Sequence, residues 1–423
     1  MTQPRSLAAL SHRNFRLLWL GLFASFSGSF MQNAAVLWHV SLLVAADRRG
    51  LALGLVGLAK IVPVVVFSIV AGVLADARDR RRLMLYTQAG AAAVALVLAV
   101  LTLRGLTVVW PIYALSAVGA AVGAFDLPAR QALVPTLVPR EHLPSAISLT
   151  STMVQAASVA GPAGAGLVIA AWGVGWAYVL NAVSFGSVVL ALLMMRDLSH
   201  GPTPREGEPG AGAVSWAAAL EGLRFVFRAP LLRATMLLDF FVTFFASATA
   251  LLPIFAQDVL HVGPRGYGWL FAAPAAGAFV TSAILVPLAA RIERRGLALL
   301  WAVAGHGLAT VVFGVSRSFW LTFACLALIG ATDMVSTVIR NVIRQLETPD
   351  RLRGRMTSIS MVFFQGGPQL GELEAGAVAQ WLGAPWSVVT GGLGCLVATA
   401  WVAVGTPVVR RYRRVEDDPG QAA

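Results

Sequence analysis

Charged side chains are scarce in this sequence. Of its 423 residues, only 12% are Asp, Glu, Lys or Arg, whereas 57% are hydrophobic, and the mean hydropathy is +0.75. A soluble globular domain has about 25% charged residues, because its surface must be hydrated. The composition therefore excludes a soluble protein and predicts an all-α integral membrane protein whose apolar helices face lipid.

Cysteines and the motifs of enzyme active sites are scarce as well. The two cysteines, Cys325 and Cys395, fall within long apolar runs, where they serve as small apolar residues rather than as a disulfide or a metal pair. The sequence has no metal-ligand spacing, no nucleophile elbow and no phosphate-binding loop. It thus predicts a protein that is not an enzyme, binds no metal or cofactor and does not use ATP directly.

Apolar runs long enough to cross a bilayer as helices are abundant. About 20 residues span the hydrocarbon layer, and breaks at charged residues, Pro and Gly leave twelve such runs, at 15–44, 51–75, 83–103, 108–127, 146–170, 175–195, 231–258, 266–290, 297–315, 319–338, 357–381 and 386–407. A polar stretch rich in Pro, Gly and Glu follows the sixth run and is typical of a flexible linker. We expect an N-terminal six-helix bundle at 1–195, a cytoplasmic linker at 196–230, a C-terminal six-helix bundle at 231–410 and a cytoplasmic tail at 411–423.

The positions of the basic residues predict the orientation in the membrane. Cytoplasmic loops accumulate Lys and Arg, and most of the 32 basic residues fall in the segments on one side, which includes both termini. The opposite side holds only Arg48, Arg49, Arg104, Arg265 and Arg317. We therefore place both termini in the cytoplasm and the protein in a cytoplasmic membrane. The net charge of +12 then reflects topology and contact with anionic lipid rather than nucleic-acid binding.

The two predicted bundles are internal repeats of each other. Identical residues recur at one constant spacing across the linker: Arg130 and Arg340, Pro139 and Pro349, Ser148 and Ser358, Gln155 and Gln365, Gly161 and Gly371, Gly166 and Gly376, Gly173 and Gly383, Trp176 and Trp386. Twelve helices in two parallel six-helix repeats resemble the major facilitator fold, which implies a secondary transporter with its substrate site near the midplane between the halves.

A charged loop after the second run carries a more specific resemblance. The stretch "GVLADARDRR" contains Gly72, Asp76, Arg80 and Arg81 and resembles the cytoplasmic signature loop of the major facilitator superfamily, although Ala77 and Asp79 depart from it. The resemblance implies a cytoplasmic gate in which the acid latches the transporter shut. A basic cluster that only anchors the helix in the membrane would also explain the arginines, but it leaves the carboxylate at the electronegative end of its own helix unexplained.

A stretch of small residues in the fifth run suggests the direction of transport. "AGPAGAG" includes Gly161, Pro162, Gly164 and Gly166 and resembles a motif of facilitator antiporters, with Ala165 in place of one glycine. That resemblance implies export, whereas close packing of two helices is the simpler explanation of small residues. Further stretches, "FDLPARQALVPTLVPREHLPSAISL" and "LLPIFAQDVLHVGPRGYGWL" among them, resemble the bacterial enterobactin exporter subgroup of efflux permeases.

Ionisable residues within the apolar runs are the candidates for chemistry, because each costs about 3 kcal/mol or more against lipid. We propose three carboxylates as proton-coupling sites: Asp239, Glu372 and Glu374. His306 is either a packed, neutral side chain or a functional one. Asp126 and Arg130 are spaced to form a structural i,i+4 pair. The candidate substrate contacts are Gln32, Asn33, Trp38, Lys60, Tyr113 and Phe244.

These features predict a secondary active exporter. Aromatic and aliphatic candidates with few polar groups favour a small, partly apolar compound such as a siderophore or a drug over a sugar. Its partners would be this substrate, protons and membrane lipid, with alternating access driven by proton antiport in a monomer. The alternatives are an uptake or lipid-flipping permease of the same fold, and a membrane receptor that transports nothing.

Overall fold

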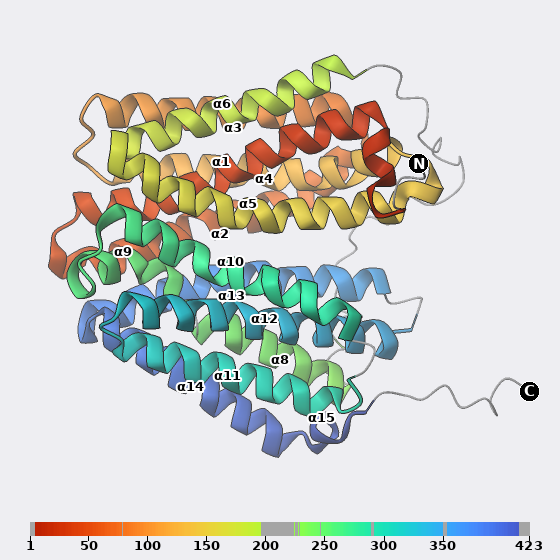
Figure 1. Cartoon of the computed structure of the whole chain (residues 1–423), viewed down its shortest axis with the longest axis vertical. Coiled ribbons are helices and arrows are strands. Elements are labelled where there is room, and N and C mark those ends of the chain that lie inside the picture. Colours follow the sequence, from red (N-terminus) through yellow and green to blue (C-terminus); the bar gives the residue numbers. More distant parts are fainter. Residues whose placement is uncertain are drawn as a thin grey trace, which may run out of the picture. The chain divides into compact units, whose positions relative to one another are not determined.

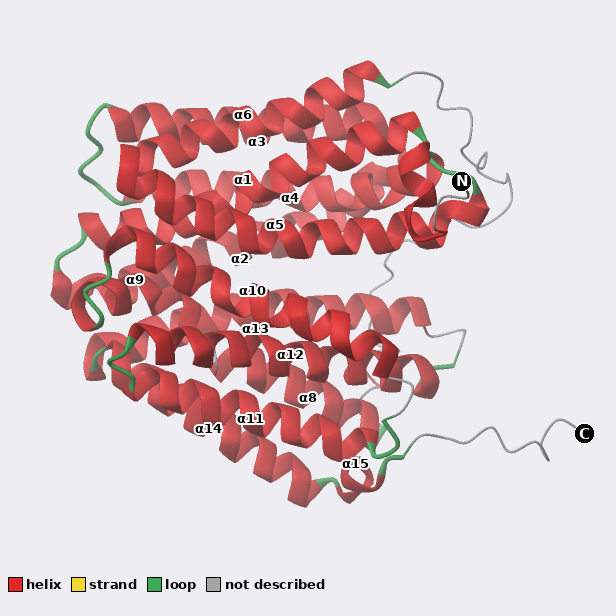
Figure 2. Ribbon diagram, in the orientation of Figure 1, coloured by secondary structure: helices red, strands yellow, loops and turns green. Residues whose placement is uncertain are grey.

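The computed structural model describes residues 5–77, 79–195, 224, 227, 229–245, 247–288, 292–349 and 353–413. In these residues all regular secondary structure is helical (Figure 2), which confirms the predicted all-α class. Ten helices in this part of the chain are long and apolar enough to cross a membrane. The chain is thus built as the composition predicts, with backbone hydrogen bonds satisfied inside each apolar segment.

Each predicted span of the first repeat corresponds to one helix. In chain order these are α1 (Arg13–Leu43), α2 (Arg49–Ala77), α3 (Arg80–Leu103), α4 (Trp110–Leu133), α5 (Leu143–Trp172) and α6 (Val174–Met194). The short helical turns η1 (Arg5–Ser11), η2 (Ala46–Arg48), η3 (Val134–Thr136) and η4 (Arg140–His142) lie at helix ends. The helices of this repeat lie side by side along most of their length (Figure 1).

The second repeat has the same order of long helices but one interrupted span. The predicted span at 231–258 is divided into α8 (Pro230–Phe245), the 3₁₀ turn η5 (Ala248–Leu251), α9 (Leu252–Ile254) and the π turn η6 (Phe255–Val259). The remaining predicted spans correspond to α10 (Gly263–Leu288), α11 (Arg295–Val315), α12 (Phe319–Glu347), α13 (Arg353–Leu382) and α14 (Ala384–Gly405), and a short α15 (Pro407–Arg411) follows.

The α1 helix is not among these ten, and the side chains of α13 are described mainly from residue 366 onward. Both helices are long, with 31 and 30 residues. Both carry more polar residues than their neighbours, among them Gln32 and Asn33 in α1, and Glu372 and Glu374 in α13. Polar residues in a spanning helix are costly against lipid, so such helices face protein or water.

The chain forms two compact units. The first contains 1–215 together with 249–272 and 376–381, and the second contains 216–248, 273–375 and 382–423. Close helix crossings bring the two later segments into the first unit. A side chain at Gly166 of α5 would come within 2.8 Å of Gly268 in α10, and one at Gly376 of α13 within 2.8 Å of Gly54 in α2. The division of the chain at the polar linker stays a prediction.

The core of the second unit positions the site described below. Leu238 and Val242 of α8 pack with Leu299 and Val303 of α11, with Ile339 of α12 and with buried residues of α14. These apolar contacts leave α8, α11, α12 and α14 in a fixed register. Polar side chains at the same level of these helices are therefore enclosed within protein.

Candidate functional site

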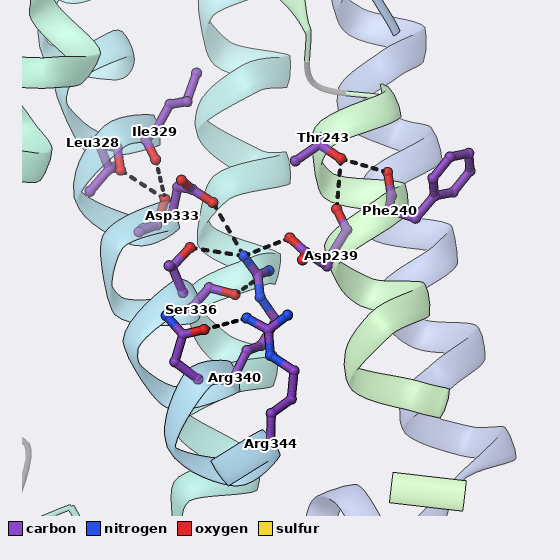
Figure 3. Close-up of polar contacts among 12 residues, drawn as sticks. Asp239, Phe240, Thr243, Leu328, Ile329, Asp333, Ser336, Arg340 and Arg344 are labelled. Carbon is purple, nitrogen blue, oxygen red and sulfur yellow. Dashed lines mark hydrogen bonds and ion pairs between the residues drawn. The ribbon is translucent and has the colours of Figure 1, made fainter. Parts of the chain in front are cut away.

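A buried ion pair joins two helices of the second unit. Asp239 of α8 is 3% exposed, Arg340 of α12 is 2% exposed, and Arg340 has the largest side chain among those that are fully buried. Arg340 Nη2 lies 2.9 Å from Asp239 Oδ1, and Figure 3 shows the guanidinium pointing from α12 toward the carboxylate on α8. Charged groups at such depth need a partner. This pair is therefore the first candidate for function.

Arg340 is also held by side chains of its own helix. Its Nη1 donates to Ser336 Oγ at 2.8 Å and its Nη2 donates to Thr337 Oγ1 at 2.9 Å. Asp333 lies 3.7 Å from Nη2, and its side chain is 43% exposed. These residues precede Arg340 by three, four and seven positions, so they lie on the same face of α12. The arginine is thus shared between a buried carboxylate and a partly exposed one.

The cluster has fewer hydrogen bonds than its polar atoms could make. Asp239 Oδ1 and Arg340 Nε have no hydrogen-bond partner among the described residues. The 2.9 Å contact between the two side chains is an ion pair whose angles fall outside hydrogen-bond geometry. The hydroxyl of Thr243 donates to the backbone carbonyl of Asp239, at 2.8 Å, and not to its carboxylate. The buried carboxylate therefore depends on Arg340 for its compensation.

The corresponding arginine of the first repeat has a different environment. Arg130 of α4 lies 3.4 Å from Asp126 at i−4, which confirms the predicted structural pair, and its guanidinium lies 4.4 Å from the ring centre of Phe26. Asp126 Oδ1 also accepts hydrogen bonds from Thr87 Oγ1 at 3.0 Å and from Gln88 Nε2 at 2.8 Å. Asp126 thus has two neutral hydrogen-bond donors besides its arginine. Of the two arginine–carboxylate pairs, that of the second repeat joins two helices, whereas that of the first repeat lies within α4.

The polar candidates for substrate contact are engaged within the first unit. Lys60 of α2 donates to Asn33 Oδ1 of α1. Gln32 Oε1 accepts a hydrogen bond from Asn181 Nδ2 of α6 at 2.8 Å. All three candidate side chains are half-buried. Their hydrogen bonds join α1 to its neighbours, and a role in binding substrate stays a prediction.

The aromatic candidates also lie in defined contacts. Tyr113 of α4 donates to the Ala52 carbonyl of α2 at 2.8 Å. Trp38 of α1 is buried against Tyr267, with ring centres 4.9 Å apart. Phe244 stacks on Phe240, one turn earlier in α8, with ring centres 5.4 Å apart. These contacts position the rings, and their role as substrate contacts stays a prediction.

The predicted gate is only partly within the described structure. Gly72 and Asp76 fall in the stretch of α2 whose side chains lie outside the described residues. Arg80 Nη1 donates to a backbone carbonyl of α4 at 3.2 Å, and Arg81 Nη2 donates to a backbone carbonyl near the end of α6 at 3.4 Å. The two arginines thus join the ends of three helices, and their role as a gate stays a prediction.

Asp79, which departs from the family pattern, has a structural task of its own. It is the N-cap of α3, and its Oδ1 accepts from the backbone N–H groups of Arg81 at 2.9 Å and Arg82 at 3.0 Å. An Asp at this position satisfies N–H groups that have no partner inside the helix. Sequence reasoning missed this role, although an Asp immediately before a helical run is a known signal for it.

The four motif residues of α5 serve unequal structural roles. A side chain at Gly161 would lie 2.5 Å from a backbone carbonyl of α1, and one at Gly166 would lie 2.7 Å from a carbonyl of α10. Gly164 faces open space, and Pro162 lies inside the helix. Close packing therefore explains the first and last glycines. A role of the motif in export stays a prediction.

The two carboxylates of α13 are half-buried. Gly371, which precedes Glu372, lies directly against the backbone of α8, where a side chain would collide with the carbonyl of Phe244. Glu374 follows on the same helix, about 200° around its axis from Glu372. The second unit thus holds three candidate carboxylates, and Asp239 is one that the described structure joins to a buried arginine. The assignment of Glu372 and Glu374 to proton coupling stays a prediction.

Arg340 was missed as a site residue by sequence reasoning. The predicted span ended at 338, which placed Arg340 in a cytoplasmic segment, whereas α12 continues to Glu347. Two features of the sequence pointed to Arg340 as a site residue: its match with Arg130 in the internal repeat, and the carboxylate of Asp239 within an apolar run. An unpaired acid within an apolar run requires a partner, and a repeated arginine was a candidate.

Comparisons with known proteins agree with this architecture. The chain matches the family of transmembrane secretion effectors of the major facilitator superfamily over residues 4–413. It is 28% identical to the enterobactin exporter EntS of Shigella boydii serotype 18 and 27% identical to that of Escherichia coli O139:H28, in both cases over 96% of this chain and 94% of the relative.

Two solved structures show the same fold at low sequence identity. A bacterial homologue of the human lysosomal transporter Spinster, in an inward-facing and unoccupied conformation, has a TM-score of 0.72 at 14% identity and covers 98% of this chain and 99% of its own. A bacterial homologue of the iron transporter ferroportin has a TM-score of 0.67 at 15% identity, with 95% and 99% covered. The chain therefore belongs to the transmembrane secretion effector family of the major facilitator superfamily and is a multi-pass membrane transporter, not an enzyme.

Proposed function

We propose that this transporter exports a small, partly apolar compound from the bacterial cytoplasm by proton antiport, and that Asp239 binds and releases the coupling proton. The observation that supports this is the buried pair of Asp239 and Arg340. A second partner for the arginine, Asp333, lies on α12 and is partly exposed. The pair thus has the parts of a switch: a buried acid, a cation, and an alternative acid that is partly exposed.

Protonation of Asp239 would change the forces between α8 and α12. A neutral carboxyl group no longer attracts Arg340, so the guanidinium would turn toward Asp333 and the link between the helices would weaken. Loss of the proton restores a buried negative charge, which requires the arginine again. Arg340 is paired with a carboxylate whether Asp239 is protonated or not. Exchange of its partner therefore avoids the free-energy cost of an unpaired buried charge. Helix movement and proton binding would thereby be coupled.

The energy source follows from the sequence. The chain has no nucleotide-binding motif, so a gradient must drive any concentrative transport. The proton gradient needs a titratable group inside the protein, and Asp239 is the candidate with a buried, exchangeable partner. Glu372 and Glu374 of α13 are the other two candidates.

The substrate class and the direction of transport rest on resemblance. Relatives at 27–28% identity are named enterobactin exporters, and the α5 motif resembles that of antiporters. The candidate contacts are mainly aromatic and aliphatic, which suits a ligand bound by apolar area and a few oriented hydrogen bonds. We therefore propose a siderophore as the first substrate class to test and drug-like compounds as the second.

The test is transport of enterobactin by the purified protein in liposomes with an imposed pH gradient. We expect the wild type to concentrate enterobactin when the gradient is present and Asp239→Asn to lose this response. Asp47→Asn makes the same chemical change at an exposed residue outside the cluster and should behave as wild type. Glu372→Gln and Glu374→Gln extend the test to the other two candidates.

Each outcome discriminates between functions. Enterobactin flux that ignores the pH gradient in the wild type contradicts proton antiport. Coupled transport that survives in all three carboxylate variants shows that the proposed proton sites are wrong. Accumulation in the opposite direction favours an uptake permease. An absence of flux for enterobactin, drug-like compounds and labelled lipid alike favours a receptor.

A further inference from the structure

A buried histidine lies beside the arginine cluster without a hydrogen-bond partner. His306 of α11 is 5% exposed, and neither of its ring nitrogens makes a hydrogen bond with any described residue. Buried imidazoles normally bond at least one nitrogen, because an unpaired polar atom inside protein costs about 1–3 kcal/mol. A packed histidine that serves only the fold does not explain two unpaired nitrogens.

The helix geometry directs the His306 ring toward the cluster. A side chain at Gly305 would lie 3.4 Å from Thr332 of α12, and one at Gly307 would lie 3.1 Å from the Gly392 carbonyl of α14. Successive residues point about 100° apart around a helix, so His306 points between the directions of α12 and α14. Because its ring is buried, it faces the interior of the second unit. Asp333 follows Thr332 and lies at the same level.

Charged groups act on the ring from the adjacent helix. Asp333 and Arg340 of α12 exert opposite electrostatic effects on His306, and the Ile329 carbonyl lies near the ring without hydrogen-bond geometry. Arg344, one turn beyond Arg340, is bonded to Asn341.

The other two packed helices add one group each. Asp239 of α8 is paired with Arg340. The sole titratable group that the described part of α14 contributes is Cys395, whose thiol points to the Val303 carbonyl at 3.9 Å. One carboxylate and one guanidinium of α12 therefore act electrostatically on the ring, and that guanidinium is the one that pairs with Asp239.

We propose that His306 is a second proton-binding site of this transporter and that Arg340 couples its protonation to that of Asp239. The proposal rests on the proton antiport proposed above. A proton adds to a ring nitrogen of the neutral imidazole and makes an imidazolium, which Asp333 attracts and Arg340 repels. When Asp239 is protonated, Arg340 is released toward Asp333, and the balance at the ring changes. The two sites therefore exchange protons as a pair rather than independently.

His39 provides a matched comparison within the same chain. It is also 5% exposed, but its Nδ1 lies 3.2 Å from the hydroxyl of Tyr178 on α6, so the ring has a partner. It belongs to the first unit, whereas the arginine cluster belongs to the second. Two histidines of equal burial thus differ in whether a ring nitrogen has a hydrogen-bond partner among the described residues.

The first experiment observes the proton directly and needs no substrate. The protein is labelled with ¹⁵N-histidine in lipid nanodiscs and titrated by NMR between about pH 5 and pH 8, where imidazole normally changes charge. His306→Gln and His306→Asn assign the signal among the six histidines. We expect His306 to titrate, and its midpoint to move by about one pH unit or more in Asp239→Asn. A ring that stays neutral throughout, or an unchanged midpoint, overturns the proposal.

The second experiment measures the consequence for transport. In liposomes loaded with enterobactin, we expect the plot of log initial rate against pH to be less steep for His306→Gln than for the wild type, by about one proton. His39→Gln should keep the wild-type slope. If Asp239→Asn abolishes coupling while His306→Gln retains the wild-type slope, the second site is wrong and proton antiport stands. If coupling survives Asp239→Asn, the proposed role of Asp239 fails, whereas the NMR titration still tests the histidine.

Discussion

Replacing Arg340 with glutamine tests whether the buried ion pair stabilises the second unit. Arg340 is the common cation of Asp239 at 2.9 Å and Asp333 at 3.7 Å. Arg340→Gln removes the cation that contacts a buried carboxylate, whereas Asp239→Asn leaves the arginine with a second acid. We therefore expect the arginine substitution to lower the free energy of unfolding more than the aspartate substitution does.

The distances give the magnitude. Breaking a buried ion pair by removing one partner costs about 3–5 kcal/mol, mainly because a charge is left uncompensated. At equal effective dielectric, attraction at 2.9 Å is about 1.3 times that at 3.7 Å, so Asp333 retains part of the attraction after Asp239→Asn, although water screens it. We expect losses of about 4 kcal/mol for Arg340→Gln and about 2 kcal/mol for Asp239→Asn. The double variant should cost less than the sum of these losses, by about 2 kcal/mol or more.

The assay is reversible unfolding in mixed detergent micelles, followed by tryptophan fluorescence for the wild type, the two single variants and the double variant. These four free energies form a double-mutant cycle, which isolates the interaction between the two side chains. Asp47→Asn, an exposed substitution, should stay within about 0.5 kcal/mol of wild type. Single effects that add within about 0.5 kcal/mol would refute the reasoning, because residues more distant than contact behave in that way.

Three further predictions concern packing, topology and the gate. Gly166→Ala places a methyl group 2.7 Å from a backbone carbonyl and should lower thermal stability by about 1–3 kcal/mol, whereas Gly164→Ala faces open space and should not; equal melting temperatures would contradict the described packing. Arg80→Cys should react with a membrane-impermeant thiol reagent only in inverted vesicles and Arg265→Cys only in whole cells, and labelling of both from one side would show the predicted topology to be wrong. Asp76→Asn should insert normally but transport more slowly and expose the cytoplasmic side to thiol probes, and unchanged probe access would leave Asp76 as a membrane anchor.

Long apolar runs made most of the fold predictable. Eleven of the twelve predicted spans correspond to one long helix each, because length and hydropathy dictate a helix in lipid. The interruption after α8 was not predictable in this way. Residues 231–258 read as one apolar run, but the helix type changes to 3₁₀ at Ala248–Leu251 and to π at Phe255–Val259. Hydropathy shows which residues avoid water but not which type of helix they form, so an apolar π segment looks the same as an apolar α-helix.

The candidate site was predictable in part. Asp239 was identifiable because an acid in an apolar run is costly. Arg340 was not, since an arginine near a span end resembles an ordinary cytoplasmic residue under the rule that places basic residues inside. The structure shows the reason for the difference: α12 extends to Glu347, and it remains packed in the core of the second unit as far as Ile343. An arginine near the end of a span can thus be either a cytoplasmic loop residue or, as Arg340 is here, the ion-pair partner of a buried carboxylate.

The two repeats show how a duplicated arginine acquires two tasks. Arg130 keeps its carboxylate on its own helix at Asp126, where Thr87 and Gln88 complete the hydrogen bonds. In the second repeat the position that matches Asp126 is Ser336, and the charge that compensates Arg340 comes from α8 instead. The two side chains of a pair within one helix keep their distance when that helix moves as a rigid body. In a pair between two helices, the distance changes when either helix moves. If Asp239 binds the coupling proton as proposed, its place on α8 rather than on α12 means that protonation changes a contact between two helices.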